Sequence, residues 1–346
     1  MRTEAAVLVE LNRPLRHAQL ELPALKPGQV LVEVAYSGVC HSQLHELRGR
    51  RGADRFLPHT LGHEGSGTVL AVGDGVSKVR PGDRVVLTWI KGRGAEVPAT
   101  VYHDGATAIN SGALSTFMRH TITCENRVVP LDDEIPLREA ALLGCAVPTG
   151  AGMVCTAANM APGSSLAVFG VGGIGLSALL AARALGAQPL IAVDVVDAKL
   201  AEASRLGATH AVNAHKCDPL SAILEITGGK GVDYAIESAG RRETMEAAFR
   251  SVRNQGGLCV LAGNLPHGEQ ISIDPYDLIR GKRVMGTWGG ETRPDDDIPL
   301  FAGWFAEGRL PLAELISHEY PLEEINSALL DLEQGCVSRA LIRMAA

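Results

Sequence analysis

The stretch from Leu166 to Gly175 constrains the fold of this chain more than any other. It reads L-A-V-F-G-V-G-G-I-G. Its apolar start predicts a buried strand, its glycines form G-x-G-x-x-G, and the Ala- and Leu-rich residues 176–185 predict a helix. Strand, tight turn and helix together are the context of a dinucleotide-binding fingerprint. Gly170 permits the turn, Gly172 lets a pyrophosphate approach the backbone, and Gly175 lets helix and strand pack closely.

The next apolar run supports the same interpretation. Residues 189–194 read P-L-I-A-V-D, and Asp194 lies about 20 residues after the last glycine, where an acid that binds the adenosine ribose is expected. Asp194 would repel a 2′-phosphate, and residues 195–198 contain no Arg, so the pattern favours NAD over NADP. The alternative is a plain glycine turn and a solvated Asp at a strand end. That alternative does not explain strand, turn, helix, strand and acid in this order.

Composition limits the classes of protein to consider. With 346 residues, 46% hydrophobic and 21% charged, the chain is long enough for two globular domains. Its net charge of −7 argues against a nucleic-acid surface. No apolar run is long enough to cross a bilayer, and the N-terminal segment, with Glu4, does not resemble a secretory signal. Seven scattered cysteines do not form a disulfide framework, so we expect a cytoplasmic protein.

Two patterns divide the chain. Residues 1–147 contain short β-branched runs separated by turn residues, which predicts a partly closed β-barrel. Residues 148–287 alternate between strand and helix patterns, which predicts a doubly wound parallel sheet. Residues 288–346 contain two helical patterns and a closing strand at 340–343, and we expect them to return to the first domain. The fold class is therefore α/β, with a β-barrel domain and a Rossmann-type sheet.

Three residues before the parallel sheet have the chemistry of metal ligands. Cys40, His63 and Cys145 would give a Cys/His/Cys set, and a catalytic zinc needs about three protein ligands and one open position. Two thiolates would cancel the charge of the ion. No short C-x-x-C motif anchors the set, so each residue can also be a core cysteine or a histidine in a turn. His59 and Glu64 do not complete an H-E-x-x-H motif with His63.

At this point the sequence resembles a known family over almost its entire length. The motifs are G-V-C-H-S at 38–42, G-H-E-G-S-G at 62–67, V-R-P-G-D-R-V at 79–85, G-C at 144–145 and the glycine stretch. The chain resembles the zinc-dependent alcohol dehydrogenases of the medium-chain dehydrogenase/reductase superfamily. The resemblance implies a GroES-like catalytic domain, a Rossmann domain and reversible oxidation of an alcohol to an aldehyde or ketone by hydride transfer to NAD. It also implies a homodimer or homotetramer that acts on a small molecule.

The resemblance assigns a catalytic role to five residues. Cys40, His63 and Cys145 match the catalytic zinc ligands, and Glu64 matches a carboxylate that can approach the metal during ligand exchange. Ser42 matches the hydroxyl that takes the proton from a zinc-bound alcohol, which leaves the alkoxide.

The resemblance also assigns the outer relay, cofactor and substrate contacts. His45 matches the outer end of the proton relay, with a ribose hydroxyl between it and Ser42. Trp89 falls where an aromatic residue lines the substrate pocket. The implied cofactor contacts are His41, Thr149, Gly170, Gly172, Gly173, Ile174, Gly175, Asp194, Lys199 and Arg339. The alternatives are a surface histidine for His45 and a solvated arginine for Arg339.

The sequence departs from the family pattern in two places. Residues 85–123 contain no cysteine, whereas many members hold a second, structural zinc there with four cysteines. We therefore expect one catalytic zinc per chain and no structural zinc. Gln43 also stands where the family usually has an Asp that supports the zinc ligands. A neutral amide supports the ligands less strongly, so either the zinc affinity falls or another acid substitutes.

Two competing functions remain at this point. One is a zinc-free reductase of the same superfamily that acts on enones or quinones with NADPH, and Cys40, His63 and Cys145 together argue against it. The other is a non-catalytic NAD-binding relative, which Gln43 slightly favours. The sequence does not identify the alcohol.

Overall fold

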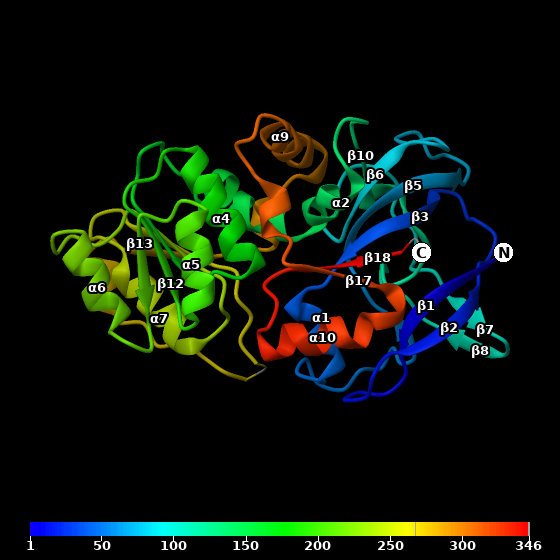
Figure 1. Ribbon diagram of the computed structural model, residues 1–346, viewed down its shortest axis with the longest axis horizontal. Coiled ribbons are helices and arrows are strands. Elements are labelled where there is room, and N and C mark those ends of the chain that lie inside the picture. The colour runs from blue at the N-terminus through cyan, green and yellow to red at the C-terminus, as the bar shows by residue number, and fades with distance from the viewer. Residues whose placement is uncertain (267, 345–346) are drawn as a thin grey trace. The chain divides into compact units, whose positions relative to one another are not determined.

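The computed structural model describes residues 1–266 and 268–344, which form two compact units. The first unit comprises 1–145, 293–306 and the described residues from 312 onward; the second comprises 146–292 and 307–311. The first is built mainly from antiparallel strands, and the second from a parallel sheet with helices (Figure 1). The predicted α/β class, with a β-barrel-type domain and a Rossmann-type sheet, is confirmed.

Two sheets form the first unit. The smaller has the order β4-β1-β2-β7-β8, and the larger has the order β10-β6-β5-β3-β18-β17, with β9 paired to β3. The smaller sheet contains β1 (Arg2–Leu8), β2 (Arg16–Glu21), β4 (His59–Thr60), β7 (Tyr102–Asp104) and β8 (Thr107–Ile109). The larger contains β3 (Gln29–Gly38), β5 (Glu64–Val72), β6 (Arg84–Thr88), β9 (His120–Cys124), β10 (Val128–Pro130), β17 (His318–Pro321) and β18 (Ala340–Arg343).

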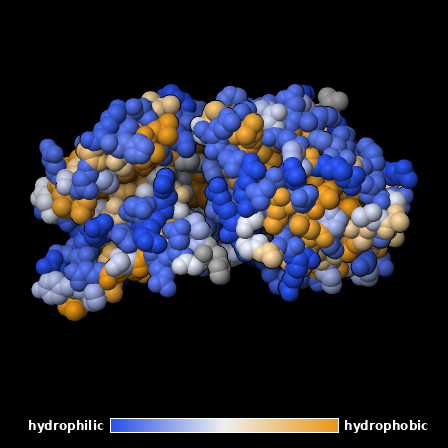
Figure 2. Space-filling view, turned by 90° about the horizontal axis from the view of Figure 1, so that it is seen from below, coloured by the Kyte–Doolittle hydropathy of each residue, from blue (hydrophilic) through white to orange (hydrophobic). Residues whose placement is uncertain are grey.

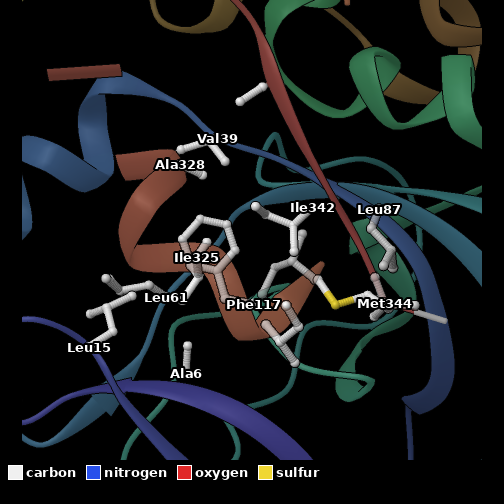
Figure 3. Packing of buried hydrophobic residues seen from close by; sticks show 14 of the residues in the cluster. Ala6, Leu15, Val39, Leu61, Leu87, Phe117, Ile325, Ala328, Ile342 and Met344 are labelled. Carbon is white, nitrogen blue, oxygen red and sulfur yellow. The ribbon is translucent and has the colours of Figure 1, made fainter. Parts of the chain in front are cut away.

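Helices join these strands and complete the core of the first unit. They are α1 (His41–Leu47), α2 (Leu137–Ala140), α9 (Pro294–Ala306) and α10 (Ile325–Gln334), with short 3₁₀ turns at Glu125–Arg127, Ala141–Gly144, Leu312–Leu315 and Leu322–Glu324. The core cluster includes Phe117, Leu87, Ile325 of α10 and Ile342 of β18 (Figure 3). Strand β18 pairs antiparallel with β3 and parallel with β17. A late segment of the chain therefore completes a sheet begun by β3.

The second unit is a six-stranded parallel sheet of order β13-β12-β11-β14-β15-β16. This is the doubly wound order. Successive strands are added on one side of β11 as far as β13 and on its other side from β14 onward, and this change of side leaves a crevice at the strand ends. The strands are β11 (Leu166–Phe169), β12 (Leu190–Asp194), β13 (His210–Asn213), β14 (Tyr234–Glu237), β15 (Leu258–Leu261) and β16 (Arg283–Gly286).

Helices flank this sheet, as Figure 1 shows for α4, α5, α6 and α7. The helices are α3 (Ala146–Gly152), α4 (Gly173–Ala184), α5 (Asp197–Arg205), α6 (Pro219–Ile226), α7 (Arg242–Ser251) and α8 (Pro275–Ile279), with a π-helical turn at Met153–Ala157 and a 3₁₀ turn at Gly289–Glu291. The central strands of the parallel sheet are short runs of Val, Ile, Leu and Ala that are buried on both faces.

Hydrophilic residues cover much of the face seen in Figure 2, and hydrophobic residues lie among them in groups. Within 1–266 and 268–344, no single helix has the length and apolar composition needed to cross a membrane. One bent pair, 137–144 with 146–157, meets the criterion only when its two parts are joined.

Candidate active site

Cys40, His63 and Cys145 come together in the first unit. Their ligand atoms all lie within 4.8 Å of one another, and in the described part of the chain this is the one such group of three. Cys40 follows β3, His63 precedes β5, and Cys145 follows the turn at 141–144. Strands β3 and β5 pair side by side, and that turn packs on β5 and β6. Pairing within one sheet thus gathers ligands that are far apart in sequence.

The electrostatics of the three residues suit a soft cation. A hydrogen bond from Cys145, and a second from His63, hold the pKa of the Cys40 thiol well below its usual range. The bond to Cys40 and burial raise the pKa of Cys145. Burial alone would lower the pKa of His63, but its hydrogen bond to Cys40 and nearby negative charge raise it. Two sulfurs and one imidazole with a fourth position free are a donor set that catalytic zinc takes, so these residues fit the ion.

A buried ion pair adjoins the cluster. Glu64, the first residue of β5, is 0% exposed, and its carboxylate accepts from the guanidinium of Arg339, which is 4% exposed. Arg339 Nη1 also donates to the Val39 carbonyl at 3.3 Å. Burial would lower the pKa of Arg339, but the charge of Glu64, and then those of Cys40 and Cys145, raise it. Arg339 is therefore a buried counterion here, not a solvated arginine.

Helix α1 carries the candidate relay residues. Ser42 Oγ lies 3.5 Å from His63 Nδ1, and His45 is half-buried one turn further along. Burial, and then the charges of Arg50 and Arg51, lower the pKa of His45, which keeps it neutral near pH 7. His41 is exposed at the start of the helix.

Gln43 lies between two of the metal-ligand candidates. It is 1% exposed; its Oε1 accepts from the Cys40 backbone N–H at 2.7 Å, and its Nε2 lies 2.6 Å from His63 Nδ1. A Gln at the third position of a helix commonly accepts from the residue that caps it, which explains its contact with Cys40. The amide thus contacts both ligand candidates at once.

A cavity of about 560 Å³ opens beside His63, and its lining includes Gln43, His59, Asp54 and Phe56. His59 Nε2 lies 2.7 Å from Asp54 Oδ2, and its Nδ1 lies 3.1 Å from the Thr60 carbonyl oxygen. The sequence does not indicate this pair, because a histidine five residues after an aspartate carries no recognisable motif. Trp89 is half-buried near the same site, with its ring centroid 6.4 Å from that of His63.

The glycine loop of the second unit has the geometry expected for a phosphate-binding turn. Gly170 has φ +85°, and a Cβ on Gly175 would lie 1.9 Å from the Gly170 carbonyl oxygen. A Cβ on Gly172 would meet no atom within 4 Å, so its backbone is open to a ligand. Gly173 and Ile174 then begin α4, a 12-residue helix whose N-terminus favours an anion.

The remaining cofactor candidates lie on neighbouring elements of this unit. Asp194 ends β12, and its Oδ2 accepts from the Val171 N–H at 2.9 Å. Lys199 lies in the first turns of α5. Thr149, in α3, is 5% exposed, and its buried Oγ1 has no hydrogen-bond partner among the described residues. A buried hydroxyl without a partner is costly, so an external group that bonds to it fits this position.

Comparison with known proteins places the chain in a family. The family model for the alcohol dehydrogenase GroES-like domain matches residues 26–133, and that for zinc-binding dehydrogenase matches residues 173–307. An S-(hydroxymethyl)glutathione dehydrogenase of Synechocystis is 31% identical over 99% of this chain and 100% of its own length. The chain belongs to the zinc-type alcohol dehydrogenases.

Solved structures of similar proteins agree with this membership. An alcohol dehydrogenase zinc-binding domain protein from Burkholderia ambifaria has a TM-score of 0.93 at 34% identity, covering 100% of both chains. The benzyl alcohol dehydrogenase of Acinetobacter calcoaceticus has a TM-score of 0.92 at 31% identity, again over 100% of both. This zinc-type alcohol dehydrogenase is an oxidoreductase that oxidises alcohols, as the sequence predicts.

Proposed function

We propose that this alcohol dehydrogenase oxidises a small-molecule alcohol with NAD and one zinc ion held by Cys40, His63 and Cys145. The observation that carries the proposal is the gathering of three ligand atoms within 4.8 Å in one unit of the fold. When bound, zinc supplies a Lewis acid for the alcohol oxygen, and NAD supplies the hydride acceptor.

In this proposal, residues of α1 move the proton. Ser42 accepts the hydroxyl proton of the substrate as it gives up its own. His45, at i+3 on the same side of the helix, accepts the released proton and passes it towards solvent. His45 suits this role because burial lowers its pKa and leaves it neutral and able to accept. Glu64 and Arg339 keep the charge beside the ligands balanced, and Trp89 limits the space for the substrate and excludes water.

The proposed NAD site uses the second unit. The open backbone at Gly172, with Gly170, Gly173, Ile174 and Gly175, forms the pyrophosphate turn. The contacts proposed outside this turn, within the same unit, are Asp194 and Lys199 to the adenosine ribose and Thr149 to the nicotinamide side. The carboxylate of Asp194 favours a free 2′-hydroxyl over a 2′-phosphate, so NAD is preferred.

We also propose that a structural zinc is absent and that Glu125 stabilises the segment around Ala95 in its place. Glu125 accepts from the backbone N–H groups of Ser77, Lys78 and Ala95 at 2.7, 2.8 and 2.8 Å. These bonds tie the segment around Ala95 to the barrel. The proposed domain limits are 1–147, 148–287 and 288–346. We also propose a homodimer or homotetramer and a cytoplasmic location.

Metal analysis together with a panel of alcohols tests the function. Wild type should hold one zinc per chain and reduce NAD with at least one primary or secondary alcohol. Cys40→Ala and His63→Ala should abolish turnover while NAD still binds, whereas Cys336→Ala, at an exposed cysteine, should behave as wild type. Turnover that survives in zinc-free protein would overturn the metal-based proposal.

A further inference from the structure

The orientation of the Gln43 amide is fixed by its partners. The Cys40 backbone N–H is a donor, so the atom 2.7 Å from it must be the carbonyl oxygen Oε1. The amide nitrogen Nε2 therefore faces His63 Nδ1 at 2.6 Å. Gln43 is only 1% exposed, so both contacts are largely shielded from solvent.

This orientation decides which nitrogen of His63 carries hydrogen. The amide nitrogen of Gln43 can only donate, so His63 Nδ1 must accept. In a neutral imidazole the hydrogen then lies on the other ring nitrogen, His63 Nε2. Ser42 Oγ, 3.5 Å from Nδ1, can donate to it as well. Gln43 and Ser42 both lie at Nδ1, so Nε2–H is the group of His63 left to face Cys40 and Cys145. The nitrogen that a metal ion would use is thus the protonated one.

We propose that Gln43 is a positioning residue that holds metal-free His63 with its hydrogen on Nε2 and thereby weakens zinc binding at Cys40, His63 and Cys145. The inference rests on the proposed zinc site. A metal-bound imidazole needs a free electron pair on Nε2 and hydrogen on Nδ1, which would then meet the amide donor of Gln43. Loading therefore requires Gln43 to give up one of its two contacts.

A carboxylate of the same shape would remove this conflict. In Gln43→Glu, one oxygen can keep the Cys40 N–H and the other can accept from Nδ1–H, which leaves Nε2 free for the metal. The matched control is Gln29→Glu, at another buried glutamine of the first unit whose Oε1 accepts a backbone N–H, from Lys26 at 2.9 Å. Both variants add one negative charge, but only the first alters the His63 contact.

Two measurements on the full-length chain test the proposal. Histidine-nitrogen NMR of metal-free protein, with the His63 signals assigned from His63→Gln, should show hydrogen on Nε2 in wild type and on Nδ1 in Gln43→Glu. Chelator competition with zinc alone should show Gln43→Glu binding about 10- to 100-fold more tightly than wild type. Gln29→Glu should match wild type in both measurements. Gln43→Asp serves as the second variant if Gln43→Glu does not fold.

Hydrogen on Nδ1 in metal-free wild type would overturn the positioning role of Gln43. Unchanged or weaker zinc binding in the folded carboxylate variant would overturn the effect on metal loading. If no protein in the series binds zinc, the proposed function and the effect on loading both fail, and the NMR result still decides the role of Gln43 in the metal-free protein. Neither readout depends on turnover, so a failed substrate panel leaves this test intact.

Discussion

At the scale of single residues, the pair formed by Glu64 and Arg339 makes the sharpest energetic prediction. Both side chains are almost fully buried, so removal of the arginine leaves a carboxylate in the interior without its counterion. We expect Arg339→Met to lower the free energy of unfolding by about 3–5 kcal/mol, measured by urea denaturation. Arg2→Met, which breaks the exposed pair with Glu21, should cost less than about 1 kcal/mol. Equal effects would show that Glu64 is not charged in the folded protein.

Single residues also show what the sequence could and could not predict. Cys40, His63 and Cys145 were identifiable because each lies in a short motif, and the structure brings them together. The Glu64–Arg339 pair joins positions 275 residues apart, and no local pattern records such a contact. Gln43 was recognisable as an unusual residue, but the direction of its amide depends on the packing of α1 against His63.

At the scale of elements, the segment around Ala95 depends on Glu125. We expect Glu125→Gln to lower the free energy of unfolding by about 1–3 kcal/mol at pH 7, because charged acceptors of three backbone N–H groups are lost. Burial raises the pKa of Glu125, but these N–H donors outweigh it and lower the pKa below its ordinary value of 4.5.

The pH dependence of the Glu125 effect follows from this shift. A lowered folded-state pKa stabilises the protein above the unfolded-state pKa, and this stability is lost as pH falls through the folded-state value. The difference between wild type and Glu125→Gln should therefore be constant from pH 7 to about 5 and shrink at lower pH. Urea denaturation at several pH values measures it, and a difference that grows on acidification would contradict the assignment.

The end of strand β12 carries the cofactor prediction. Asp194→Gly removes a carboxylate that the glycine loop holds through the Val171 N–H. We expect KM for NAD to rise and the preference for NAD over NADP to fall, because a 2′-phosphate no longer meets a like charge. Steady-state kinetics with both cofactors measure the ratio. An unchanged preference would place the ribose elsewhere.

Elements differ in how well the sequence predicts them. Helices α5 and α6 lie within residues 148–287, whose alternating strand and helix patterns predict helices between the strands. Asp218 caps α6 by accepting from the Ser221 N–H, whereas α5 has no side-chain cap. Helices α1 and α3 were not predicted. The seven residues of α3, A-V-P-T-G-A-G, include Pro and Gly, which oppose helix formation, so packing against α4 imposes the helix.

At the scale of the whole molecule, zinc binding should be visible as stability. A ligand that binds only the folded state adds about 2.7 kcal/mol at a concentration one hundred times its Kd. We expect zinc to raise the unfolding midpoint of wild type, and chelator to reverse the change. Cys40→Ala should show neither effect, and an equal response in this variant would mean that zinc binds elsewhere.

Strand β18 lies between β3 and β17, so its insertion has a consequence for the nascent chain on the ribosome. Translation must pass through all of residues 146–292 before 340–343 emerge to meet β3. The parallel sheet can form during synthesis. The barrel is made earlier, but until β18 emerges the end of β3 lacks that partner strand and Glu64 lacks Arg339. An unpaired strand edge is a template for pairing with another chain, so the nascent barrel is open to aggregation at this edge until residues 340–343 emerge.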